Sequence, residues 1–121
     1  MINSGCMLLK KGDKVLVAHR RLFEKDSVRF FVGQIDDYEA GVVKVKGHSF
    51  VRDGMSGLMI EKSDERTKIL SIASGTLLVH QLPDAVELDG LRFEILGTQL
   101  LLTNGREFTM NLTEHPHDGQ L

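Results

Sequence analysis

The chain has 121 residues, of which 41% are hydrophobic and 26% charged, and its formal net charge is −2. These values are typical of a single globular domain, 1–121, and they exclude a disordered chain or two domains of normal size. The longest unbroken apolar runs, 6–9 and 15–18, are far shorter than the roughly 20 residues that cross a bilayer. One cysteine allows no internal disulfide, and with no secretory signal we expect a cytoplasmic protein, with Met1 or Met7 as its start.

Short apolar runs that alternate with polar residues predict strands along the whole chain, and no window shows sustained helical periodicity. In chain order the expected strands are 14–22, 29–37, 42–52, 56–61, 67–73, 76–82, 91–96, 99–103 and 107–113. Asp53-Gly54 and Ser74-Gly75 predict hairpins between their flanking strands. This spacing favours an all-β barrel or sandwich, followed by a flexible tail over 114–121.

Two glycines, Gly33 and Gly47, lie inside predicted strands, where glycine normally weakens packing. Such glycines mark a bulge or the sharp bend of a barrel corner. Two bent strands in succession favour a small, strongly bent barrel over 14–83, with an appended C-terminal β-meander over 84–113.

Two stretches of the chain carry motifs built around a glycine. Arg29–Val45 contains an aromatic-x-Gly-x-aliphatic strand, an acidic-aromatic turn and a further aliphatic strand. Lys68–Asp84 contains two short strands joined at Gly75 and closed by Pro83. These stretches resemble the two signatures of the Sm-like family of small β-barrels, and the resemblance implies a bent five-stranded barrel that assembles into rings. An SH3-like barrel would produce much the same pattern.

The same resemblance does not imply binding of uridine-rich RNA. In the Sm-like family an Asn after the acidic-aromatic turn and an Arg before the turn glycine hold the base. Here those positions fall near Ala40-Gly41 and on Ser74, which offer neither a hydrogen-bonding fork nor a stacking plane.

A strand of alternating basic residues predicts a second kind of nucleic-acid surface. Period two places Lys44, Lys46, His48, Phe50 and Arg52 on one face of the strand 42–52. Basic side chains with an aromatic are typical of a nonspecific nucleic-acid surface, although a solvated strand face has the same pattern. The predicted nucleic-acid-binding residues are Lys44, Lys46, His48, Arg52, Arg20, Arg21 and Tyr38.

Charge is unevenly spread along the chain. Residues 1–62 carry 11 Lys/Arg against 8 Asp/Glu, a net of +3, whereas residues 63–121 carry 4 against 9, a net of −5. This division is consistent with a basic face toward nucleic acid, with attraction between subunits, or simply with solvated charges.

The sequence carries no catalytic or cofactor motif, so we expect no enzyme activity, no cofactor and no metal. His19, His48 and His80 lie on separate predicted strands, and His115 and His117 lie in the predicted tail. Metal sites need three or four ligands on fixed elements, and the sequence predicts no such set.

Several predicted strands are apolar on both faces. Phe30 and Val32 lie opposite Phe31, and Leu100 and Leu102 lie opposite Leu101. Either the meander or a second subunit must cover the second face. We therefore expect a non-enzymatic binding and assembly module that forms a homo-oligomer and binds a macromolecular partner. Nonspecific binding of RNA or single-stranded DNA through the basic strand face is the alternative, and an enzyme whose site forms between subunits is a further one.

Overall fold

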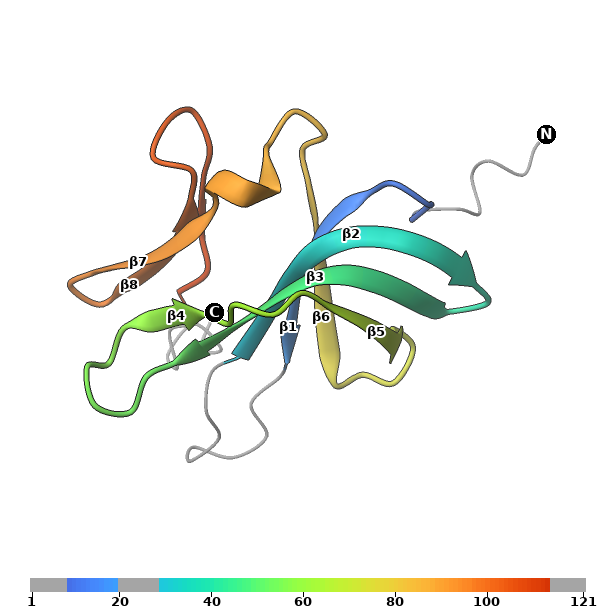
Figure 1. Ribbon diagram of the computed structural model, residues 1–121, viewed down its shortest axis with the longest axis horizontal. Coiled ribbons are helices and arrows are strands. Elements are labelled where there is room, and N and C mark those ends of the chain that lie inside the picture. Colours follow the sequence, from blue (N-terminus) through green and yellow to red (C-terminus); the bar gives the residue numbers. More distant parts are fainter. Residues whose placement is uncertain (1–8, 20–28, 114–121) are drawn as a thin grey trace, which may run out of the picture.

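The structure of the chain is a computed structural model that describes residues 9–19 and 29–113. Within these ranges the chain is all-β, with nine strands and one short 3-10 helix, and no helix there is long and apolar enough to span a membrane (Figure 1). The elements are β1 (Lys14–His19), β2 (Arg29–Glu39), β3 (Val42–Arg52), β4 (Met59–Glu61), β5 (Arg66–Ser71), β6 (Leu77–Leu82), η2 (Leu88–Gly90), β7 (Arg92–Leu96), β8 (Gln99–Thr103) and β9 (Thr109–Asn111). The predicted all-β class is thus confirmed, while the predicted tail lies outside the described residues.

The strands form two antiparallel sheets. In the larger sheet β4, β3, β2, β1 and β6 pair in that order, and β5 also pairs with β3. The length of β3 allows both pairings, since its residues 42–47 pair with β5 and its residues 50–52 pair with β4. The smaller sheet is the predicted meander, in the order β7-β8-β9.

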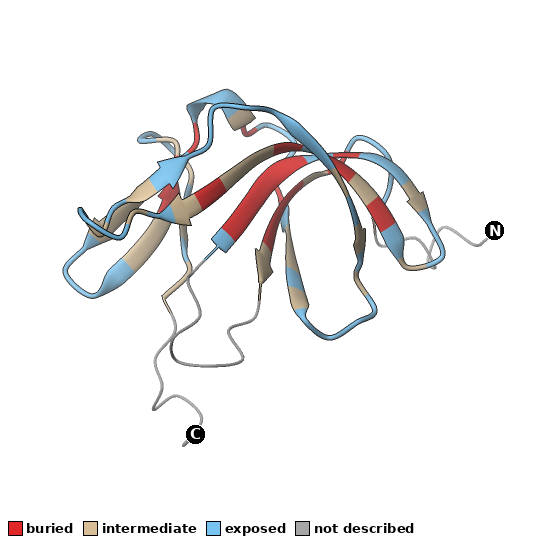
Figure 2. Ribbon diagram, turned by 60° about the horizontal axis from the view of Figure 1, so that its bottom comes forward, coloured by how far each residue is buried: buried red, intermediate tan, exposed pale blue. Residues whose placement is uncertain are grey.

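The glycines inside β2 and β3 permit an unusually close approach of the two strands. Gly33 and Gly47 face each other across the strand pair. A β-carbon on Gly33 would overlap the carbonyl oxygen of Lys46, and one on Gly47 would overlap that of Val32. No side chain fits at this point, and the larger sheet is strongly arched (Figure 2). The two glycines therefore mark a bend. The β-bulge of this strand pair lies at a different point, between Ile35 and Asp37.

The arched sheet is not closed into a barrel among the described residues. The hairpin predicted at Ser74-Gly75 is wrong, because β5 pairs with β3 and β6 pairs with β1. Leu70 and Ile72 at one edge and Leu77 and Val79 at the other pack against a common buried cluster. Side-chain packing rather than backbone pairing therefore joins the two edges.

Two buried clusters lie on the two faces of the arch. The inner cluster fills its concave side and contains Val15, Val17, Phe31, Ile35, Val43 and Val45. The outer cluster lies between the arch and the meander and contains Leu16, Phe30, Val32, Phe50, Leu82, Val86, Leu91 and Leu102. The central strands are apolar on both faces because both faces are covered.

The meander supplies the cover for the outer face. The ring of Phe93 on β7 stacks on Phe30 with 4.8 Å between centroids and meets Phe50 edge-on at 4.9 Å. Leu102 on β8 is fully buried in the same cluster. The interpretation that a second subunit covers these residues is therefore wrong. Phe50 belongs to the core and not to an exposed basic face.

Candidate functional site

The predicted basic strand face lies on the outer side of β3. Lys46 and Arg52 are exposed, whereas Lys44 and His48 are half-buried. Arg52 is bound within its own hairpin, because its Nε–H donates to the carbonyl oxygen of Gly57 at 2.8 Å. This face thus contains the four β3 residues that the sequence indicates.

The other residues of the predicted surface are not brought to this face. The β2–β3 register shifts between Ile35 and Asp37, so Tyr38 pairs with Val43 and packs against the inner cluster. Its ring therefore lies on the opposite side of the sheet from the β3 lysines. Arg20 and Arg21 lie outside the described residues.

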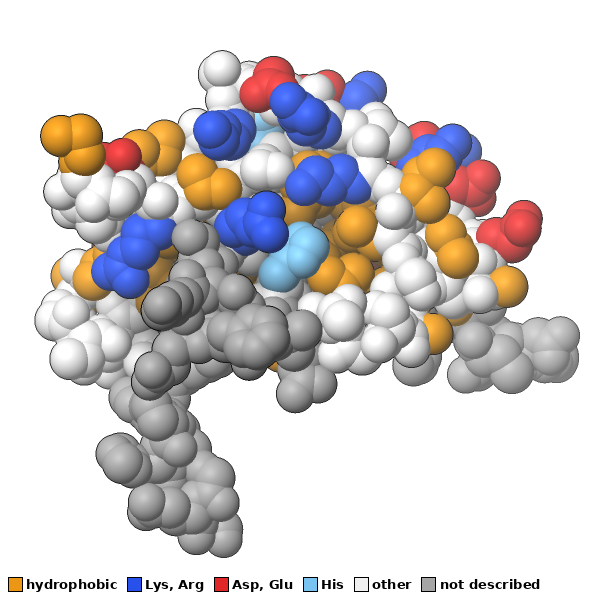
Figure 3. All heavy atoms as spheres, turned by 90° about the horizontal axis from the view of Figure 1, so that it is seen from below, with side chains coloured by type: hydrophobic (Ala, Val, Ile, Leu, Met, Phe, Trp, Pro, Cys, Tyr) orange, Lys and Arg blue, Asp and Glu red, His pale blue; other side chains and the backbone are white. Residues whose placement is uncertain are grey.

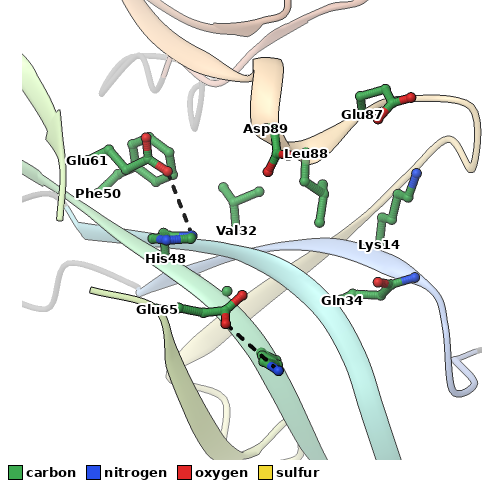
Figure 4. Close-up of a pocket in the computed structure, with 12 residues that line it drawn as sticks. Lys14, Val32, Gln34, His48, Phe50, Glu61, Glu65, Glu87, Leu88 and Asp89 are labelled. Carbon is green, nitrogen blue, oxygen red and sulfur yellow. Dashed lines mark ion pairs between the residues drawn. The ribbon is translucent and has the colours of Figure 1, made fainter. Parts of the chain in front are cut away.

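An outer cleft of about 430 Å³ lies between β3 and η2 (Figure 4). Lys46 Nζ lies 3.8 Å from a carboxylate oxygen of Glu65, and His48 Nδ1 lies 3.8 Å from one of Glu61. Lys14 Nζ donates to two main-chain carbonyls, at 2.7 and 2.6 Å. Four carboxylates line the cleft, those of Glu61, Glu65, Glu87 and Asp89. The surroundings of Lys46 and His48 are therefore of mixed charge, with a carboxylate beside each of the two side chains.

A second pocket, of about 270 Å³, has a different composition. Among the described residues, four cationic side chains and a histidine line it, together with one carboxylate and the apolar side chain of Val51. We call it the basic pocket, and its residues are His19, Arg29, Phe30, Ser49, Val51, Lys62, Asp64, Arg66 and Lys68. Figure 3 shows lysine and arginine side chains gathered around a histidine and apolar side chains on the underside of the molecule.

Strand pairing brings these cations together from distant parts of the chain. Arg29 pairs with Val51 across β2 and β3, and Lys68 pairs with Val45 across β3 and β5. Val45 belongs to the inner cluster, so Lys68 emerges at the edge of that cluster on the concave side. Its Nζ lies 4.8 Å from the centroid of the Phe31 ring, a cation–π contact that fixes its position.

The link between β4 and β5 adds two further groups. The amide of Lys62 donates to the carbonyl oxygen of Ser49 at 2.8 Å, which holds the start of this link beside β3. Asp64 accepts a hydrogen bond from the Nε–H of Arg66 at 2.7 Å. This bond is the main cause of the lowered pKa of Asp64. The Asp64 carboxylate is thus already engaged by the guanidinium of Arg66.

The cations of the basic pocket repel one another. Burial lowers the pKa of Lys68, and the charges of Arg29 and Arg66 lower it further. Burial also lowers the pKa of His19, with Arg29 and Lys68 adding to the effect. Both shifts disfavour further positive charge in the pocket. A bound anion would relieve this repulsion.

The histidines do not form a metal site within the part of the chain that the structure describes. His19 lies in the basic pocket and His48 in the outer cleft, while His80 pairs with Leu16 on β1. Residues 9–19 and 29–113 contain no group of three or more His, Cys, Asp or Glu side chains that could hold a metal ion. The pair His115 and His117 lies outside these ranges.

Sequence reasoning missed Lys62, Arg66 and Lys68 as site residues. Arg66 and Lys68 are two positions apart on β5, so period two places both on one face. This two-residue spacing can be read from the sequence. It does not indicate that this face of β5 lies beside Arg29, which precedes Arg66 by 37 positions.

Comparison with known proteins adds no assignment. None of the family models, curated proteins or solved structures compared with the chain matches it.

Proposed function

We propose that the protein is a non-enzymatic binding module that holds single-stranded nucleic acid at the basic pocket. The observation that carries this proposal is the convergence, among the described residues, of four cations around one carboxylate that is already bonded to Arg66. Phosphates of a bound strand would replace the missing negative charge and release the counterions condensed on that strand.

The other lining groups suit a nucleic acid better than a simple salt. Arg29 and Arg66 carry planar guanidinium groups, which both fork toward phosphate oxygens and stack on bases. Val51 provides apolar surface beside them. A pocket on the concave side of an arch admits a flexible single strand more readily than a rigid duplex, so we infer a single-stranded partner.

A pair of double variants tests the proposal and separates it from binding at the β3 face. Arg29→Gln with Lys68→Gln removes two charges from the basic pocket, and Lys44→Gln with Lys46→Gln removes two from the outer side of β3. We expect fluorescence anisotropy with a labelled single-stranded RNA to show at least a tenfold loss of affinity in the first variant and less than a twofold loss in the second. The reverse order would place binding at the β3 face, and no binding by the wild-type chain would overturn the proposal.

We further infer that the arch is a small barrel of the Sm-like or SH3-like kind, opened along the seam between β5 and β6. The five strands β6, β1, β2, β3 and β5 and the glycine bend support this interpretation.

Self-association is a second proposal, favoured by the same open seam. Among the described residues β5 pairs with β3 and β6 pairs with β1, which leaves the other edge of each strand available. These strands also carry exposed apolar residues, Ile69 at 69% exposure and Leu78 at 46%. We expect light scattering to give a multiple of 13.5 kDa, and Ile69→Lys to shift the mass toward the monomer. A wild-type mass of one chain would contradict self-association.

A further inference from the structure

The basic pocket has the size of a site for one compact group. Its volume of about 270 Å³ lies just below the roughly 300–1,000 Å³ of typical small-molecule sites. Such a pocket takes a phosphate with part of its sugar, and does not enclose several nucleotides. The cations of the pocket would therefore all face a single bound anionic group.

Charge density distinguishes the two kinds of phosphate on a nucleic acid. A phosphodiester within a nucleic-acid strand carries one negative charge. A pocket that binds it must also accommodate the nucleotides on both of its sides. A terminal phosphomonoester carries about −1.5 to −2 at pH 7 and offers three strong acceptor oxygens. Among the described residues the pocket has four cations and one carboxylate, which is already bonded to Arg66, and this balance matches a terminal phosphomonoester better than a phosphodiester.

We propose that the basic pocket binds the terminal phosphomonoester of a nucleic-acid strand, with Arg29, Arg66 and Lys68 as its principal donors. This inference rests on the proposed function and narrows it from any single strand to a phosphorylated strand end. Asp64 orients the guanidinium of Arg66 through the 2.7 Å hydrogen bond, and the Phe31 ring positions Lys68. Lys62 adds a fourth charge from the link between β4 and β5.

His19 couples this binding to a proton. Among the described residues, the charged groups that line the pocket with it are Arg29 from β2, Lys62 and Asp64 from the link before β5, and Arg66 and Lys68 from β5. Burial and the nearby cations hold the pKa of His19 below its usual value. A bound dianion opposes the effect of those cations, so binding raises the pKa of His19 and favours uptake of a proton by the imidazole.

The test compares oligonucleotides that differ only at their ends. One sequence is prepared with a 5′-phosphate, with a 3′-phosphate and with hydroxyl groups at both ends, each labelled away from the end under test. We expect one phosphorylated strand to bind at least tenfold tighter than the hydroxyl strand, and millimolar inorganic phosphate to remove the difference. Equal affinity for all three strands would overturn the end-binding inference and leave the proposed function standing. No binding by any strand would overturn both.

Two further measurements identify the class of ligand and the residues that bind it. A phosphoserine peptide that binds as tightly as the phosphorylated strand would overturn the assignment to nucleic acid. Arg29→Gln with Lys68→Gln should abolish the preference for the phosphorylated end, whereas Lys44→Gln with Lys46→Gln should retain it. Retention in both variants would place the phosphate elsewhere.

The role of His19 is measured by calorimetry in buffers of different ionisation enthalpy, which gives the number of protons taken up on binding. We expect the wild-type chain to take up part of a proton at pH 7 with the phosphorylated strand. His19→Gln should reduce that uptake. An unchanged uptake in His19→Gln would overturn the coupling.

Discussion

Binding at the basic pocket should weaken steeply as salt concentration rises, by an amount that follows from its cations. For single strands, log K falls with log salt concentration with a slope of about −0.7 for each neutralised phosphate charge. The pocket takes one terminal phosphomonoester, which carries up to about two negative charges at pH 7, so the slope should approach about −1.4, which is a loss of about sevenfold in affinity for a fourfold rise in salt. Arg29→Gln with Lys68→Gln removes two of the four cations that line the pocket among the described residues. Its slope should be about −0.7, a loss of about 2.6-fold over the same range.

Fluorescence anisotropy titrations of a labelled single strand at five salt concentrations give the two slopes. Lys44→Gln with Lys46→Gln serves as the control, because it removes the same charge from the outer face of β3 and should keep the wild-type slope. A slope in Arg29→Gln with Lys68→Gln equal to that of the wild type would refute the assignment of phosphate contacts to the basic pocket. A reduced slope in the control would show that the β3 face makes those contacts instead.

Three predictions concern the fold that positions the pocket. Gly47→Ala places a β-carbon against the carbonyl oxygen of Val32, so urea unfolding should show a loss of about 3 kcal/mol or more, whereas Gly54→Ala, which meets nothing within 4 Å, should change stability little. Phe93→Ala removes both aromatic contacts with the arch and should cost about 3 kcal/mol; a loss below about 1 kcal/mol would contradict the role of the meander as a cover. Because the folded-state pKa of His19 is lowered, the unfolded chain takes up its proton first as pH falls below about 6.5, so stability should fall from pH 7 to pH 5. His19→Gln should lose part of that dependence, and an identical pH profile would contradict the lowered pKa.

Local signals in the sequence were sufficient for the strands and most turns. Period-two alternation placed β1, β2 and β3, and the pair Gly33 and Gly47 correctly indicated a bend. The hairpin at Ser74-Gly75 failed because a turn dipeptide specifies a change of direction and not the partner of each strand. β3 is long enough to pair with both β4 and β5, and β6 pairs with β1.

The site depended on information that alternation does not contain. A register shift after Ile35, which no residue type marks, turned Tyr38 to the inner face. The acidic neighbours of Lys46 and His48 come from Glu65 and Glu61, beyond the strand on which the basic pattern was recognised. The convergence of cations in the basic pocket likewise depends on how β2 and β5 each pair with β3. Alternation within one strand does not reveal these registers.

Side-chain NMR of arginine tests the central claim most directly. The Nε–H signals of Arg29 and Arg66 report on the basic pocket, and those of Arg52 and Arg92 report on the outer side of the molecule, where Arg52 bonds to Gly57 and Arg92 to Glu94. Titration with a 5′-phosphorylated or 3′-phosphorylated single strand should shift the signals of Arg29 and Arg66 and leave those of Arg52 and Arg92 in place. Shifts confined to Arg52 and Arg92, with Arg29 and Arg66 unmoved, would contradict binding at the basic pocket.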